Sequence, residues 1–183
     1  MTITKKKSGA GHTPALLNQA LGARVNRCFG CGPANDCGLK LRFHLDHATN
    51  TTMAKVKLTG RYEGPPGHIH GGIIATILDE AMGKVNRLFD TVSMTRHMEI
   101  DYLRPSPLGQ THTVTGRLVR REGRKMFMEG EIRNAAGELL ARSKGLFIEI
   151  DPVALFAQQT RRRVNGACPV AVATAGKRTR TAK

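Results

Sequence analysis

The sequence predicts an α+β fold in which a curved antiparallel sheet wraps around one long central helix. Between about Gly71 and Phe89, apolar residues recur at helical spacing and fall on one half of the predicted helix. Segments of β-type composition lie on both sides of this stretch, two before it and four after it. A single helix with one apolar half needs a sheet face to cover it, so a sheet curved around the helix is the economical arrangement.

The two strands expected before the helix are Leu39 to Leu45 and Thr52 to Leu58. The second alternates between the two faces of a strand, and the first does so in part, so we expect them to pair. The loop Gly64-Pro65-Pro66-Gly67 then breaks the strand pattern ahead of the helix.

Four strands are expected after the helix, at Thr91 to Leu103, Gln110 to Arg120, Lys125 to Arg133 and Glu138 to Ile150. Pro105 and Pro107 end the first of them, because proline cannot donate to a sheet. Glu122-Gly123 and Ala136-Gly137 are typical hairpin turns between the later strands.

Positive charge is concentrated at the two ends of the chain. The 183 residues carry a net charge of +15, yet residues 1–27 contain five basic residues and residues 161–183 contain seven, both without an acid. We therefore expect a basic, disordered N-terminal segment at 1–27, one domain at 28–150 and a basic, disordered tail at 151–183. Because the domain itself is only mildly basic, we do not expect nucleic acid as a partner.

No apolar run approaches the ~20 residues of a membrane span, and the N-terminus lacks the apolar segment of a secretory signal. These features predict a soluble, cytoplasmic protein with no membrane partner. In such a protein the four cysteines are expected to be thiols rather than a disulfide framework.

Two adjacent glycines begin the predicted helix, although glycine costs about 1 kcal/mol relative to alanine in a helix interior. The first N–H groups of a helix have no intrahelical partner and carry partial positive charge. Without a Cβ on Gly71 or Gly72, a carbonyl oxygen can approach these groups closely, as an oxyanion does during acyl transfer. The alternative is that the glycines only allow the preceding loop to turn into the helix.

Asp79 is the candidate catalytic carboxylate. On the helix it lies opposite the apolar stripe, where a carboxylate is ordinarily a solvated surface group, and the glycine-rich start is what favours a functional role. It could act as a general base toward water or attack a carbonyl itself, and the sequence leaves both open. Eight residues separate it from Gly71, which is about 12 Å along a helix. If both are catalytic, each site must combine Gly71 of one subunit with Asp79 of another.

Other polar residues near the helix start have structural interpretations. His68 and His70 could act as acid or base near neutral pH, but no carboxylate or cysteine lies at ligand spacing beside them. We expect His70 to fix the loop by hydrogen bonding, and we retain it and Gly72 as candidate substrate contacts. Glu80 points about 100° away from Asp79 and is expected to form a salt bridge or to act as a helix charge.

The cysteines at positions 28, 31 and 37 suggest a zinc site, but a closed structural site needs a fourth ligand. Cys168 lies in the basic tail, and His44 or His47 could in principle complete the set. We expect no metal and no cofactor.

The block from Gly67 to Ala81, with His70-Gly71-Gly72 and Asp79, resembles the hotdog-fold acyl-CoA thioesterases of the PaaI type. Asp101-Tyr102-Leu103-Arg104-Pro105 is similar to the strand end that follows the helix in that family. Cys28-Phe29-Gly30-Cys31-Gly32-Pro33-Ala34-Asn35, with Gly38-Leu39, is similar to a cysteine-glycine segment found in a subset of it.

This resemblance implies a hotdog fold, hydrolysis of an acyl-CoA thioester, and a homodimer that can pair into a homotetramer. It also implies that Gly71 supplies the oxyanion N–H, that Asp79 is the catalytic carboxylate and that Thr95 helps to place the attacking water. A polar residue that relatives often carry in the loop before the helix falls near Gly64 here.

Coenzyme A carries phosphates, so its site should include basic residues. The candidates are Arg104 at a strand end and Arg120, Arg121, Arg124 and Lys125 at a hairpin. Guanidinium groups bind phosphate in a bidentate manner, although a solvated turn explains the same hairpin charges.

Two other functions remain open from the sequence. The first is a non-catalytic acyl-CoA-binding regulator whose basic ends contact nucleic acid. The second is a hotdog-fold hydratase or dehydratase, which acts on the acyl chain rather than at the thioester carbonyl. Release of free thiol distinguishes hydrolysis from both.

Overall fold

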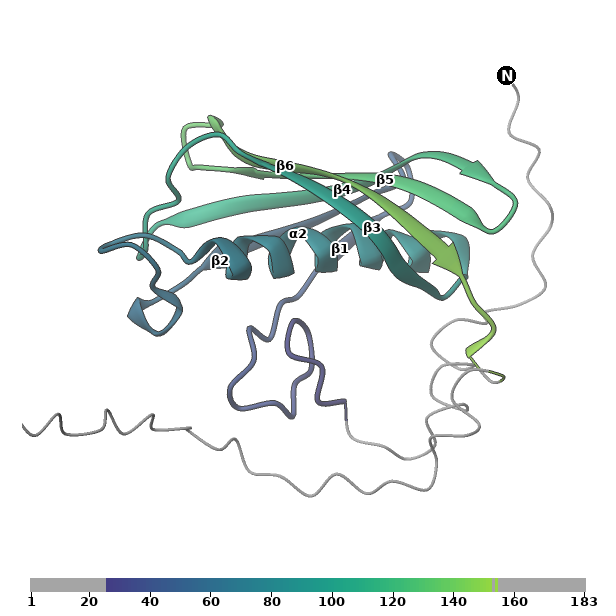
Figure 1. Cartoon of the computed structure of the whole chain (residues 1–183), viewed down its shortest axis with the longest axis horizontal. Helices are drawn as coiled ribbons and strands as arrows, with labels where there is room; N and C mark the ends of the chain where they lie inside the picture. Colours follow the sequence, from purple (N-terminus) through teal and green to yellow (C-terminus); the bar gives the residue numbers. More distant parts are fainter. Residues whose placement is uncertain (1–25, 153, 155–183) are drawn as a thin grey trace, which may run out of the picture.

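One antiparallel six-stranded sheet curves around a single long helix, as the sequence predicts (Figure 1). The computed structural model describes residues 26–152 and 154, so the predicted disorder of the two ends falls largely outside the described residues. The strands are β1 (His44–Asp46), β2 (Thr51–Lys57), β3 (Ser93–Tyr102), β4 (Thr111–Glu122), β5 (Lys125–Arg133) and β6 (Leu139–Glu149). The helices with described bounds between residues 26 and 150 are η1 (Gly60–Tyr62), α2 (Gly71–Val85) and η2 (Asn86–Phe89).

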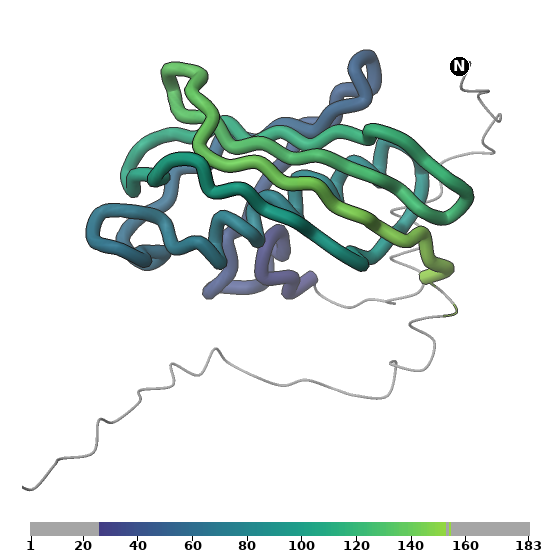
Figure 2. The backbone as a smooth tube through the Cα atoms, turned by 45° about the horizontal axis from the view of Figure 1, so that its top comes forward, coloured from purple at the N-terminus to yellow at the C-terminus, as the bar shows by residue number. Residues whose placement is uncertain are grey.

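The strand order is β1-β2-β4-β5-β6-β3, with every neighbouring pair antiparallel. The predicted hairpin turns are confirmed, because Gly123 and Gly137 both adopt positive φ between the strands that they connect. The chain passes from α2 into β3 at the far edge of the sheet, and β6 then lies between β3 and β5 (Figure 2). In the described part of the chain β3 therefore pairs on one side only.

The predicted strand from Leu39 to Leu45 is wrong over most of its length, since β1 contains only His44–Asp46. The residues before β1 bond to the N-terminal loop instead. The N–H of Leu39 donates to Phe29 O (2.8 Å) and that of Leu41 donates to Gly30 O (2.9 Å). Lys40 between them has a positive φ of 51°, which is incompatible with a continuous strand.

Helix α2 begins at Gly71, as predicted, but its regular α-helical part ends at Val85 and the tighter η2 continues to Phe89. Its buried side chains face the concave side of the sheet: Ile74, Ile77, Leu78, Ala81, Met82 and Val85. The buried Thr52 hydroxyl on β2 donates to Ala81 O at 2.8 Å. This contact ties the helix backbone to the sheet and so fixes which side chains of α2 face outward.

Within the residues that the structure describes, no helix combines the length and apolar character needed to cross a membrane.

Candidate functional site

The start of α2 offers one backbone donor without an acceptor in the described part of the chain. His70 is the N-cap, and its Nδ1 accepts from the N–H of Gly72 at 2.9 Å. The N–H of Gly72 is therefore engaged within the protein, whereas no acceptor is present for that of Gly71 among the described residues. Because Nδ1 accepts, a neutral His70 carries its proton on Nε2. The side chain of His70 thus forms a structural hydrogen bond, to the first turn of the helix rather than to the loop before it.

The loop before α2 is held on several sides. The N–H of His70 donates to Tyr62 O (2.9 Å) and that of Ile69 donates to Ser106 O (2.8 Å). His68 is also structural, with its Nδ1 at 2.8 Å from Pro66 O. A Cβ at Gly64 would lie 2.8 Å from the Cα of His70, so close packing explains why no side chain stands there. These contacts fix the position of the first helical N–H groups.

Asp79 and Thr95 are brought together, as the resemblance implied. The hydroxyl of Thr95 on β3 donates to Oδ1 of Asp79 at 2.6 Å. Asp79 is half-buried on α2, and Thr95 is exposed on the edge strand. The second carboxylate oxygen has no protein donor among the described residues, so it can accept a proton or a hydrogen bond from water.

Several features of the surroundings shift the pKa of this carboxylate. Burial raises the pKa of Asp79 above its ordinary value, and the nearby negative charge of Glu80 acts in the same direction. The hydrogen bond from Thr95 opposes this rise by favouring the charged form. A raised pKa increases the basicity of an aspartate that must accept a proton.

A β-bulge follows Thr95. The register between β3 and β6 shifts between Thr95 and His97. Bulges bend the strand and redirect side chains, and they are common beside functional sites. Sequence reasoning gave no sign of this irregularity, because the β-type composition continues through it.

Tyr102 lies against the start of α2, a contact that the sequence did not predict. Its hydroxyl donates to Gly71 O at 3.1 Å, although its side chain is half exposed. A Cβ built on Gly71 would touch the Tyr102 ring at 3.6 Å, an ordinary contact distance. Packing within the described part of the chain thus does not require glycine at position 71.

The predicted phosphate-binding arginines do not form one cluster. Arg104 follows the Tyr102 end of β3 and pairs with Glu138 (2.8 Å). Arg121 pairs with Glu149, which is opposite Ser93 at the other end of β3. The other two hairpin arginines are also engaged: Arg120 pairs with Glu122 and lies over the ring of Phe127, and Arg124 donates to Glu149 O. Arg104 and the hairpin arginines therefore lie at opposite ends of β3 within one chain.

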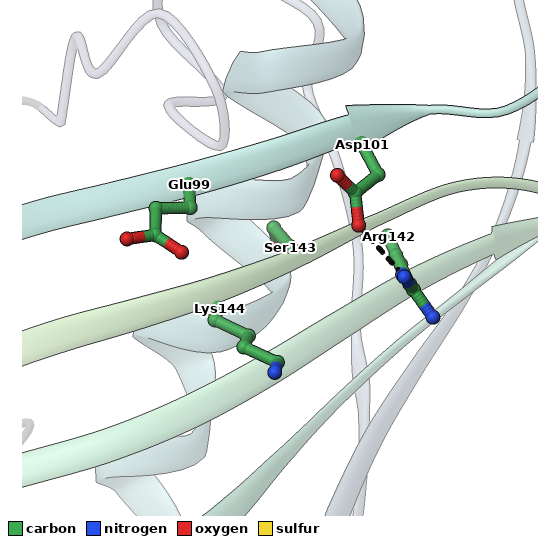
Figure 3. A pocket seen from close by; sticks show the side chains of 5 residues that line it. All are labelled: Glu99, Asp101, Arg142, Ser143 and Lys144. Atoms are coloured by element: carbon green, nitrogen blue, oxygen red, sulfur yellow. Dashed lines mark hydrogen bonds and ion pairs between the residues drawn. The ribbon is translucent and has the colours of Figure 1, made fainter.

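A shallow pocket on the outer face of the sheet involves none of the predicted site residues. It is lined by Glu99, Asp101, Arg142, Ser143 and Lys144 from β3 and β6 (Figure 3). Asp101 and Arg142 form an ion pair across it at 2.7 Å. Its lining is salt-bridged surface, so we do not assign it to substrate.

Glu80 forms the predicted salt bridge, with Oε2 at 2.9 Å from Nζ of Lys84. Burial alone would raise its pKa, but the Lys84 ammonium and hydrogen bonds from Cys31 and Cys28 outweigh burial and lower it. Burial raises the pKa of the Cys31 thiol to about 11. The expectation that all cysteines are thiols is wrong for Cys37, which is disulfide-bonded.

The candidate site thus has two parts on one helix: an N–H at its start that has no acceptor among the described residues, and a half-buried carboxylate with a hydroxyl donor at its middle. The first can stabilise an oxyanion and the second can activate water. Comparison with known proteins agrees with this chemistry. The model of the thioesterase superfamily matches residues 66–141.

Among curated relatives, acyl-coenzyme A thioesterase THEM4 of Rattus norvegicus is 37% identical over 91 residues. The match covers 49% of this chain and 39% of the rat protein, so this chain spans well under two thirds of that relative.

Two solved structures extend the comparison. Protein RHA08564, a thioesterase superfamily protein, is 33% identical with a TM-score of 0.64, and the match covers 77% of this chain and 68% of that one. The E. coli PaaI protein from the phenylacetic acid degradation operon is 20% identical with a TM-score of 0.57, covering 61% and 80%, and shares the fold. The chain described here belongs to the thioesterase superfamily and has its hotdog fold.

Proposed function

We propose that this protein hydrolyses an acyl-CoA thioester to a free acid and coenzyme A, at sites shared between two subunits. The observation that carries the proposal is the contact of 2.6 Å between Thr95 Oγ1 and Asp79 Oδ1. Asp79 lies on a helix whose first N–H, that of Gly71, has no acceptor among the described residues. Membership of the thioesterase superfamily and the similarity to the acyl-coenzyme A thioesterase of Rattus norvegicus support this substrate class.

In the proposed reaction, Thr95 holds one oxygen of Asp79 and the other oxygen accepts a proton from water. The water oxygen attacks the thioester carbonyl, and the N–H of Gly71 from the partner stabilises the oxyanion. Collapse of the tetrahedral intermediate breaks the carbon–sulfur bond. The coenzyme A thiolate takes up the proton that Asp79 received, which returns the carboxylate to its starting state.

Two subunits are part of the proposal because one chain separates its two functional groups by about 12 Å along the helix. The edge of β3 supports such pairing. In the described residues this edge has no neighbouring strand, and it carries the exposed side chains of Met94, Thr95 and Tyr102. Unpaired strand edges of this kind are places where another chain can add. A homodimer, alone or within a homotetramer, brings Gly71 of one chain toward Asp79 of the other.

A thiol-release screen with short, long and aromatic acyl-CoAs tests the activity. We expect free thiol from at least one class. Binding of acyl-CoA without thiol release would favour the regulator, and modification of the acyl chain without thiol release would favour the hydratase or dehydratase.

Mixing two inactive variants tests the shared site. Gly71→Pro deletes the N–H donor, yet proline is favoured at the first position of a helix. The preceding His70, at φ −61° and ψ 137°, already has the conformation that proline requires of its neighbour. Gly71→Ala keeps the N–H but adds a Cβ, so comparing it with Gly71→Pro separates loss of the donor from hindered access to it.

After subunit exchange between Gly71→Pro and Asp79→Asn, about half of the dimers are mixed and each mixed dimer has one intact site. We therefore expect about a quarter of the wild-type activity to return. A mixture that exchanges subunits, as native mass spectrometry would show, but stays inactive would place both groups within one chain.

A further inference from the structure

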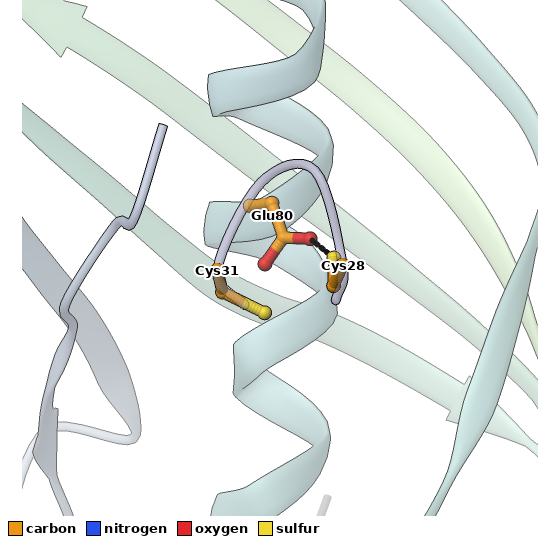
Figure 4. A group of neighbouring side chains, drawn as sticks. All are labelled: Cys28, Cys31 and Glu80. Atoms are coloured by element: carbon orange, nitrogen blue, oxygen red, sulfur yellow. Dashed lines mark hydrogen bonds between the residues drawn. The ribbon is translucent and has the colours of Figure 1, made fainter. Parts of the chain in front are cut away.

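The N-terminal loop places two thiols beside Glu80 of α2 (Figure 4). Glu80 directly follows Asp79 in the helix. The sulfur atoms of Cys28 and Cys31 and a carboxylate oxygen of Glu80 all lie within 4.8 Å of one another. Cys28 donates to Glu80 Oε1 at 3.2 Å. Neither Cys37 nor the histidines at positions 44 and 47 take part, so the third polar group comes from the helix and not from the residues that the sequence suggested.

The loop is shaped to hold this arrangement. The N–H of Gly32 donates to Cys28 O at 2.8 Å, which closes the turn that brings both sulfurs to one side. A Cβ on Gly30 would lie 2.4 Å from Cγ of Glu80, so only glycine allows the loop to approach the carboxylate this closely. Neighbouring backbone bonds from Leu39 and Leu41 to Phe29 and Gly30 anchor the loop from its other side.

The charges of the cluster fit a divalent cation. Nζ of Lys84 lies 2.9 Å from Glu80 Oε2 and 2.9 Å from Cys31 Sγ, so a cation already bridges the two ligands. With both cysteines as thiolates, the three ligands carry three negative charges. One divalent ion and the Lys84 ammonium balance them, with Lys84 donating to the bound sulfur from outside the coordination sphere.

We propose that Cys28, Cys31 and Glu80 form a zinc site that fastens the N-terminal loop to α2. Two sulfurs and one carboxylate suit Zn²⁺, whereas Mg²⁺ and Ca²⁺ prefer oxygen ligands. Tetrahedral ligands at about 2.0–2.3 Å from one Zn²⁺ lie about 3.3–3.8 Å apart, so atoms within 4.8 Å of one another would close in by no more than about 1.5 Å on binding. Cys28 is exposed, and water can occupy the fourth position from that side. The site is independent of the proposed hydrolysis and revises the expectation of no metal.

Metal titration of the whole, reduced chain tests this proposal. We expect one Zn²⁺ per chain by elemental analysis, and a sulfur-to-metal charge-transfer absorbance when Co²⁺ or Cd²⁺ is used as the probe. The double variant Cys28→Ser/Cys31→Ser should lose both signals, and Glu80→Gln should weaken binding at least tenfold. Asp79→Asn is the matched control on the neighbouring residue and should bind Zn²⁺ like the wild type.

Alkylation of the unmodified protein keeps the test independent of how the variants fold. Zn²⁺ should slow iodoacetamide labelling of Cys28 and Cys31, as mapped by mass spectrometry. Unchanged labelling, absence of the thiolate absorbance, or conversion of the two thiols to a disulfide without metal uptake would each overturn the proposal. Metal content, absorbance and labelling do not depend on whether the protein releases thiol from acyl-CoA. The zinc proposal can therefore fail while the proposed hydrolysis holds, and the reverse.

Discussion

Asp79 and Glu80 are adjacent on one helix and yet have opposite environments. Asp79 faces the edge strand β3, where its protein donor is the neutral hydroxyl of Thr95, and its pKa is raised. Glu80 faces the N-terminal loop, where Lys84 and two thiols surround it, and its pKa is lowered. The rotation of about 100° between neighbouring helical residues separates the two. Their chemistry is therefore decided by what packs on each side of α2.

The largest expected effect is the loss of catalysis on replacement of Asp79. Asp79→Asn keeps the shape of the side chain but removes the base, so we expect turnover to fall by about 10²–10⁴-fold. Steady-state thiol release from the best acyl-CoA substrate measures it. Asp36→Asn is the control, because that side chain is 96% exposed and far along the chain from the helix. Full activity in Asp79→Asn would show that Asp79 is not the catalytic base.

Replacement of Glu80 should instead cost stability. Glu80→Gln leaves the largely buried Lys84 ammonium without its carboxylate, and we expect the free energy of unfolding to fall by about 1–3 kcal/mol. Because the pKa of Glu80 is lowered in the folded state, this contribution is present above the ordinary value of 4.5 and is lost as the pH falls further.

Urea denaturation at pH 7 in a chelating buffer measures this loss without bound metal. Glu99→Gln is the control, since that side chain is 73% exposed and pairs with the similarly exposed side chain of His97. Equal unfolding free energies for Glu80→Gln and the wild type would show that the ion pair contributes nothing.

Thr95→Val should move the pH dependence of turnover. The Thr95 hydroxyl lowers the pKa of Asp79, so its loss raises that pKa further. Aspartate must be ionised to act as a base, and the acid limb of the pH–rate profile should therefore shift to higher pH. We also expect turnover on the plateau to fall by roughly threefold to tenfold.

Profiles of the wild type, Thr95→Val and the control Thr95→Ser, all in chelating buffer, test the role of this residue. The serine variant keeps the donor and should keep the wild-type inflection. A valine variant with lower turnover but an unshifted inflection would mean that Thr95 acts only through packing.

The smallest expected effect is a gain in stability for Asp79→Asn. Burial disfavours the charged form of Asp79. Replacing this carboxylate with a neutral amide should therefore raise the free energy of unfolding at pH 7 by about 0.5 kcal/mol. Such a gain is common when a functional residue is replaced. Below the ordinary aspartate pKa of 3.8 both states are protonated and the difference should vanish. Denaturation at pH 7 and pH 3 measures it, and a destabilised variant at pH 7 would contradict the raised pKa.

The sequence by itself determined the periodic elements and their turns. The predicted helix start at Gly71 is confirmed, and Lys125–Arg133 is predicted with the bounds that β5 has in the structure. Apolar periodicity and turn glycines are local patterns, so they predict helices, strands and turns without any information on tertiary contacts. The spacing of Gly71 and Asp79 is equally local, and it was enough to predict that one helix cannot hold a whole site.

The tertiary structure decided what each polar side chain meets. Leu39 and Leu41 hydrogen-bond to the N-terminal loop and not to a neighbouring strand. Arg104 and the hairpin arginines lie at opposite ends of β3. Glu80 lies beside two cysteines that are distant in the sequence. These contacts join residues far apart in the chain, for example Cys28 and Glu80, which are 52 positions apart. No periodicity or spacing encodes such distances, because they arise only when the sheet and the loop pack against the same helix.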